Sequence, residues 1–203
     1  MGANFVSSWS LIRLAGLAAL SSGVLAAMGD LLGLVVDLEN PQSATTASHA
    51  VVFLLYLIST ALLLLGLVGL YISQSEAVDV LGLVGFLVAF LGTVLLAGAL
   101  WFELFITPSL AAEAPELLAA ELGRLGFILM ILLGAVGWVL FGVATLRAGV
   151  YPRWAAILLI VGGVIAFLPV PLVGIIFSVS VAYLGFMLFT GQVRSDEQPS
   201  RVS

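Results

Sequence analysis

Apolar residues form six long runs along the chain, and short polar stretches separate them. The runs cover approximately residues 11–36, 49–72, 80–106, 117–146, 153–168 and 172–190. A helix crosses a hydrocarbon core of about 30 Å with roughly 20 apolar residues, because each residue adds about 1.5 Å. We therefore predict an all-α fold, a polytopic transmembrane bundle of six helices. The first, third and fourth runs exceed the required length and are expected to tilt or project, whereas the fifth is the shortest.

Proline and polar residues mark the breaks between the runs. Residues 37–48 contain an Asn-Pro pair and are predicted to form an exposed loop. Pro108 is expected to end the third helix, while Pro115 and Pro152 suit the first turns of the fourth and fifth helices. A tight turn is predicted between the last two helices. We therefore expect one transmembrane helical domain over residues 1–191 and a short polar tail over residues 192–203.

The arginines predict the orientation in the membrane. Five of the six fall at the ends of runs or in the tail: Arg13, Arg147, Arg153, Arg194 and Arg201. With six spans, all five lie on one side, which the positive-inside rule makes the cytoplasm. Both termini are then cytoplasmic, and the turn at residues 73–79 faces the cytoplasm without an arginine. Cleavage of the first run as a signal peptide is an alternative, but its extension to residue 36 favours a retained helix.

Composition places the chain in a membrane and excludes several classes of function. Of 203 residues, 63% are hydrophobic and 8% are charged, whereas soluble domains carry about 25% charged residues. The absence of cysteine and lysine excludes disulfides, thiolate chemistry and Schiff bases, and the single histidine excludes a His-rich metal centre. A net charge of −5 argues against nucleic acid as a partner. No cofactor and no metal centre are predicted.

Five ionisable side chains lie within the runs or at their edges, near the predicted outer face of the bilayer: Asp30, His49, Glu103, Glu121 and Arg124. A charge at the centre of a span costs about 2.5–3.5 kcal/mol on insertion scales, so such residues indicate a functional site. Glu121 is one helical turn before Arg124. These residues are candidates for a ligand site or an intramembrane ion pair.

Three interpretations of this group stay open. An outward-facing polar pocket would let Arg124 hold an anion or pair with a carboxylate. An ion-pair clasp would join Arg124 to Asp30 or Glu103, and the shared depth of these residues favours it. In the third interpretation, Glu103 and Arg124 snorkel to the interface. A metal site from Asp30, His49 and Glu103 has a suitable set of ligand types, but the spacing carries no ligand signature.

Small and hydroxyl-bearing residues give a second pattern. Those at helical spacing in the third and fourth runs predict that the two helices pack closely, as small residues allow in lipid; they are Gly82, Gly85, Ala89, Gly92, Ala99, Gly123, Gly126, Gly134 and Gly137. Gly29 and Gly33 form a GxxxG pair in the first run. Hydroxyl groups inside the runs are expected to bond to backbone one turn back or to a neighbouring helix; they belong to Ser59, Thr60, Thr93, Ser178 and Ser180.

Two stretches resemble a known class of proteins. The first is WFELFITP at residues 101–108, followed by APELL at residues 114–118, and the second is LRAGVYPRWAA at residues 146–156. Together they resemble a family of small multi-pass inner-membrane proteins of bacteria that has no established activity. The resemblance covers roughly the second half of the chain. It implies a helical membrane fold and the bacterial cytoplasmic membrane, and it implies no site residue.

Two functional classes are carried forward. The first is a structural or accessory component of the cell membrane, with the lipid bilayer and either a membrane-protein partner or a second copy of the chain as partners. The second is a small permease or channel with an outward-facing polar site. The confinement of the ionisable groups to one outer layer favours the first, because a permeant path needs polar groups at several depths. An enzyme is not predicted, since nucleophiles, bases and metal ligands are scarce.

Overall fold

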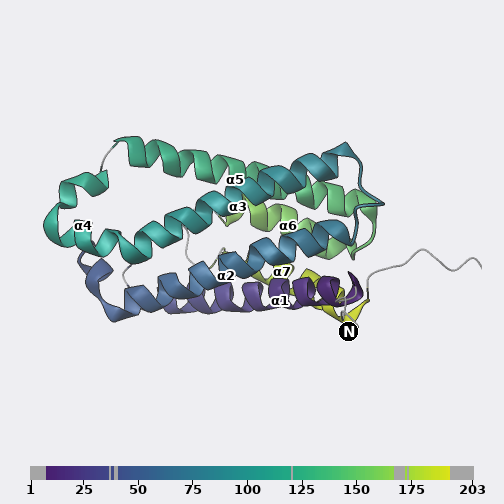
Figure 1. Ribbon diagram of the computed structural model, residues 1–203, viewed down its shortest axis with the longest axis horizontal. Helices are drawn as coiled ribbons and strands as arrows, with labels where there is room; N and C mark the ends of the chain where they lie inside the picture. Colours follow the sequence, from purple (N-terminus) through teal and green to yellow (C-terminus); the bar gives the residue numbers. More distant parts are fainter. Residues whose placement is uncertain are drawn as a thin grey trace, which may run out of the picture.

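A computed structural model describes residues 8–36, 38, 41–119, 121–166, 172 and 174–192. This part of the chain contains seven α-helices and two short 3-10 turns, with no β-strand. The elements are α1 (Ser8–Gly33), η1 (Pro41–Thr45), α2 (Ala47–Ile72), α3 (Val80–Phe105), α4 (Thr107–Glu113), η2 (Pro115–Ala119), α5 (Glu121–Ala148), α6 (Arg153–Ile165) and α7 (Gly174–Thr190) (Figure 1).

The six longer helices coincide with the six apolar runs. Four regions are long and apolar enough to cross a membrane: α1, α2, α3 and the stretch Pro115–Ala148 that includes η2 and α5. The helices α6 and α7, with 13 and 17 residues, fall below that length. The all-helical prediction is confirmed, together with four helices suited to a membrane. Apart from Gln192, the predicted tail lies outside the described residues.

Local signals in the sequence set several helix ends. The side chain of Thr46 accepts a hydrogen bond from the backbone amide of His49 and caps α2. The carboxylate of Asp79 caps α3 in the same way. The prediction for Pro108 was incomplete, because α3 ends before it and Pro108 then lies in the first turn of the unpredicted helix α4. Pro115 begins the 3-10 turn η2 and not the first turn of α5.

The six longer helices form a closed ring in chain order. Each packs against its neighbours in the sequence, α1 with α2, α2 with α3, α3 with α5, α5 with α6 and α6 with α7, and α7 closes the ring against α1. We call the end where α1 begins and α7 finishes the terminal end of the bundle. The opposite end, where α4 packs on η1, is the α4 end (Figure 1).

Glycines allow the helices of the ring to approach closely. A Cβ atom on Gly92 of α3 would lie 2.6 Å from Gly134 of α5, and one on Gly85 would lie 2.6 Å from the backbone of Phe141. Gly137 lies in the same way against Ala89. The predicted contact between the third and fourth runs is therefore confirmed at these positions, and it depends on the absence of side chains.

The same prediction was wrong at two other glycines. Gly123 and Gly126 of α5 have no atom within 4 Å of a Cβ position, so they lie outside the contact with α3. Gly82 lies against Val78 in the turn before its own helix. Because α3 and α5 diverge towards the α4 end in Figure 1, the glycines near the start of α5 cannot reach α3.

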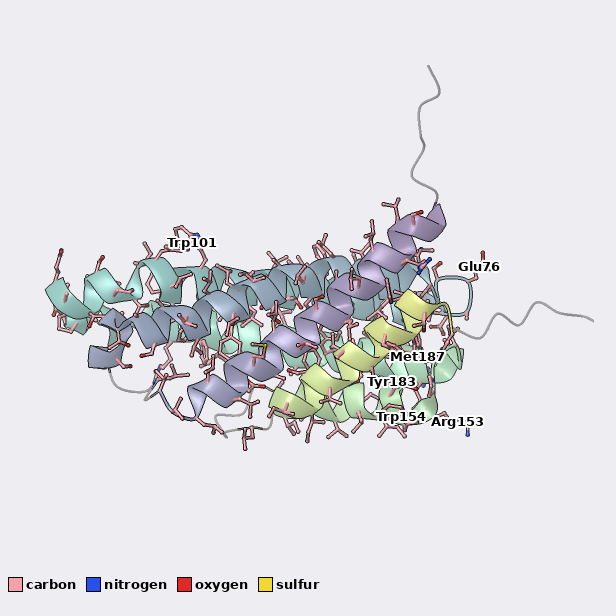
Figure 2. All side chains as sticks on the ribbon, turned by 90° about the horizontal axis from the view of Figure 1, so that it is seen from below. Glu76, Trp101, Arg153, Trp154, Tyr183 and Met187 are labelled. Carbon is pink, nitrogen blue, oxygen red and sulfur yellow. The ribbon has the colours of Figure 1, made fainter. Side chains whose placement is uncertain are left out.

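The exterior of the ring is apolar. Side chains such as Leu65 and Phe127 are 61% and 56% exposed, and most other large exposed side chains are aliphatic. Figure 2 shows Trp101 and, at a different level along the bundle, the neighbouring Trp154 and Tyr183. Both tryptophans are about half exposed, as in the aromatic belts of membrane proteins. Such a surface is suited to lipid.

Candidate functional site

The ring encloses a cavity of about 280 Å³ that extends from the middle of the bundle towards the α4 end. Five helices and the residue after α6 line it. Small and hydroxyl-bearing residues form one part of the wall, and aromatic and aliphatic side chains form the other. The lining residues are Ser22, Gly23, Ala26, Asp30, Tyr56, Ser59, Thr60, Leu63, Thr93, Leu96, Leu100, Trp138, Ala166, Gly174, Phe177, Ser178 and Val181.

Asp30 supplies the carboxylate of the cavity. The Tyr56 hydroxyl donates a hydrogen bond of 2.9 Å to the Asp30 Oδ1 atom. The Asp30 Oδ2 atom is buried and has no hydrogen-bond partner among the described residues. One oxygen of the carboxyl group is therefore held in place, and the other is left to a proton or to a ligand.

Two glycines make room for this arrangement. A Cβ atom on Gly29 would lie 2.8 Å from the Tyr56 ring, so its absence lets the ring lie against α1 and reach Asp30. A Cβ atom on Gly174, at the start of α7, would lie 3.0 Å from the Asp30 Oδ2 atom. The GxxxG pair of α1 was predicted as a motif for helix packing. At Gly29 it instead makes room for the Tyr56 side chain, not for the backbone of a neighbouring helix.

Among the described residues that line the cavity there is no arginine, lysine or histidine. Arg13 donates to the backbone oxygen of Phe189 at the terminal end, which ties the first helix to the last. Arg124 lies in the exposed part of α5. The predicted clasp between Arg124 and Asp30 is therefore wrong: the Tyr56 hydroxyl bonds to Oδ1, and Oδ2 has no hydrogen-bond partner among the described residues. The ring places α2 and α7 beside Asp30, and these helices carry no arginine there.

Hydroxyl groups join the helices at mid-depth. Ser59 donates 2.9 Å to the backbone oxygen of Ser22 on α1, and its Oγ atom lies 3.3 Å from the Ser22 Oγ atom. Thr93 donates to the Ala89 carbonyl one turn back and accepts from the Trp138 indole at 3.3 Å. The predicted bonds from Ser59 and Thr93 to backbone are confirmed. Their place in a cavity wall was not predicted.

The other predicted site residues lie outside this wall. His49 is 3% exposed and stacks on Phe53 with ring centroids 4.4 Å apart. Its Nδ1 atom is buried and has no hydrogen-bond partner among the residues that the structure describes. The side chain of Glu121 is outside the described residues. Within the described part, no three His, Cys, Asp or Glu residues gather into a metal-binding group, so Asp30, His49 and Glu103 do not form the alternative metal site.

A packed apolar layer separates the cavity from the terminal end. Leu67, Phe141 and Leu184 come from three helices and are at most 1% exposed. They belong to the buried core of the ring, with Trp138 packed edge-on against the Phe141 ring. We call Leu67, Phe141 and Leu184 the apolar plug. Because the plug is fully packed, the cavity is closed towards the terminal end.

A second set of buried polar groups lies beyond the plug. The Gln74 side-chain amide donates 3.0 Å to Thr145, and its oxygen is buried without a partner among the described residues. The hydroxyls of Ser73 and Tyr151 lie 2.7 Å apart and connect the turn after α2 to the turn after α5. Burial raises the pKa of Tyr151 to about 12, so the phenol stays protonated. Sequence reasoning missed this cluster, since none of its members stands out in a run.

These features define a class, a helical bundle suited to a membrane with a carboxylate-bearing cavity among its helices. No family model, curated protein or solved structure matches the chain. The resemblance to the bacterial inner-membrane family therefore stays a prediction, and the cavity itself is the basis for an assignment of function.

Proposed function

We propose that this protein is a small permease that binds a small organic cation in the central cavity. The observation that carries the proposal is Asp30, a carboxylate without a cationic partner among the described residues, in a cavity closed on one side. A buried charge is stable only when it is paired or neutralised. An incoming cation would supply the missing charge, and the free Oδ2 atom is where it would bind.

The rest of the wall indicates the body of the ligand. The rings of Tyr56, Trp138 and Phe177 line the cavity together with aliphatic side chains. Aromatic faces attract organic cations and also accept apolar groups. A volume of about 280 Å³ suits a small molecule rather than a peptide or a lipid chain. The substrate class is thus amines and quaternary ammonium compounds with a small apolar body.

Buried polar groups at more than one depth support transport over an accessory role. The cavity hydroxyls lie on one side of the apolar plug, and the cluster of Gln74, Thr145 and Tyr151 lies on the other. The sequence had placed ionisable groups in one outer layer only, which favoured the accessory interpretation. Uncharged polar side chains lie beyond that layer. Displacement of the apolar plug would therefore join the cavity hydroxyls to the cluster around Gln74 in one polar path.

The binding site is tested by the melting temperature of the purified protein in detergent. Benzyltrimethylammonium should raise Tm, whereas neopentylbenzene, its neutral isostere, should not. At a concentration of about 100 times Kd, the expected stabilisation is about 2.7 kcal/mol. Asp30→Asn should abolish the response because the neutral amide cannot pair with the cation. Glu103→Gln, outside the cavity wall, is the matched control and should keep it. Equal responses to both compounds, or an unchanged response in Asp30→Asn, would contradict the proposal.

The proposal includes six spans, with both termini in the cytoplasm of a bacterial cell. Three of the four described arginines, Arg13, Arg147 and Arg153, lie at the terminal end, in support of this orientation. Because the chain has no cysteine, single substitutions report topology directly. We expect Ser109→Cys in α4 to react with a membrane-impermeant maleimide in intact cells. Ser75→Cys should react only after the membrane is opened, and labelling of position 75 from outside would refute the six-span arrangement.

A further inference from the structure

We propose that the Asp30 carboxyl group exchanges a proton for the organic cation, so that one proton leaves the protein for each cation bound. The inference rests on the proposed function and specifies its driving force. Its basis is geometric: one carboxyl oxygen accepts a hydrogen bond from Tyr56 at 2.9 Å, and the other is buried with no hydrogen-bond partner in the described part of the chain.

The empty cavity determines the first state of the exchange. With no cationic group among the described residues of the wall, an ionised carboxylate at Asp30 would be a half-buried charge that no cation pairs. A proton on Oδ2 removes that charge. The carbonyl oxygen Oδ1 keeps the hydrogen bond from Tyr56. A Cβ atom on Gly174 would lie 3.0 Å from Oδ2, so the absence of a side chain there leaves room beside this oxygen.

The bound cation determines the second state. The neutral carboxyl group and a cation R₄N⁺ give the carboxylate paired with R₄N⁺ and a free proton, so the O–H bond breaks and the net charge is the same on both sides. The proton passes to water as the cation enters. Proton and cation therefore compete for one carboxyl group, and a proton gradient across the membrane would drive cation exchange in the opposite direction.

Few other groups could supply this proton. From α2, Tyr56 is the titratable residue that faces Asp30. The lining residues of α3, α5 and α7 include Thr93, Trp138 and Ser178 but no acid, arginine or histidine. On α1 itself, the other lining residues are Ser22, Gly23 and Ala26. Asp30 and Tyr56 are therefore the two candidates, and substitution separates them.

The test measures proton release when benzyltrimethylammonium binds the full-length protein in detergent. This probe carries no ionisable proton, so any proton released comes from the protein. Calorimetric titrations in two buffers that differ in ionisation enthalpy should give about one proton released per cation. Where the empty protein is protonated, Kd should fall about tenfold for each unit of rise in pH, because one proton is displaced. Binding with no proton release and a constant Kd would overturn the exchange and leave the cation site intact. The absence of binding at every pH would overturn both.

Variants identify the residue that releases the proton. Tyr56→Phe should still release one proton, as should the control Glu103→Gln. Asp30→Asn should release none, and full release from that variant would overturn the assignment to Asp30. An infrared difference spectrum of the unaltered protein makes the test independent of how the variants fold. The carbonyl band of a protonated carboxyl group should disappear when the probe is added, and its persistence at full occupancy would overturn the proposal.

Discussion

Gly92→Leu is expected to destabilise the bundle by at least about 3 kcal/mol, at the upper end of the usual cost of overpacking. The Gly92 position of α3 lies against the backbone of Gly134 on α5, where a Cβ atom would be only 2.6 Å away. A neighbouring side chain could move aside, but a helix backbone cannot move without separating the two helices. Thermal unfolding in detergent, followed by circular dichroism, measures the loss.

Gly98→Leu is the matched control on the same helix. A Cβ atom at Gly98 would have no neighbour within 4 Å, so the added side chain should lie in lipid or detergent and leave Tm nearly unchanged. The helix propensity gained at both positions is the same. Equal melting of the two variants would show that α3 and α5 do not pack through Gly92.

Phe141→Ala is expected to cost about 3–5 kcal/mol, the range for removal of a buried aromatic side chain. Phe141 is 1% exposed and fills the apolar plug between the cavity and the cluster around Gln74. Its removal leaves a void that the surrounding helices can only partly fill. Chemical or thermal unfolding in detergent should show the loss as a lower midpoint.

Phe127→Ala provides the comparison for this result. Phe127 lies on the same helix and is 56% exposed on the outside of the ring. Its replacement removes the same atoms without creating an internal void, so the effect on the midpoint should be small. A loss as large for Phe127 as for Phe141 would place both side chains in the same environment and refute the plug.

The helices themselves could be predicted from the sequence because lipid imposes a simple rule. A span must be a long apolar run, and its ends must fall at polar residues, prolines or caps. The runs therefore coincide with α1, α2, α3, α5, α6 and α7. Helix α4 was missed because Thr107–Glu113 is short and because Pro108 in its first turn also suits the end of the preceding helix.

The site was only partly predictable. Asp30 stood out as an acid within an apolar run, and the cavity wall includes it. Its partner Tyr56 is 26 positions away on another helix, and no spacing rule joins them. Charge and predicted depth alone suggested Arg124 as the partner, because Arg124 and Asp30 carry opposite charges and lie in the same outer layer of the predicted spans. Packing decides which helices are neighbours in the ring. The small residues that allow this packing occur on every helix, so they do not indicate which helices will pair.

Because the ring closes between α1 and α7, it cannot be complete until α7 has been synthesised. Gly16 of α1 lies against the backbone of Leu188 and Phe189, and Gly23 lies against Ala182, so this face of α1 is unpartnered until α7 is made. During that interval Asp30 also lacks the wall that Gly174 provides. The nascent chain therefore exposes a polar group and a glycine-lined helix face until α7 arrives. We expect the membrane insertion machinery to shield both during that interval. Products that stop before α7 should be degraded as incomplete proteins, although they contain every other helix of the ring.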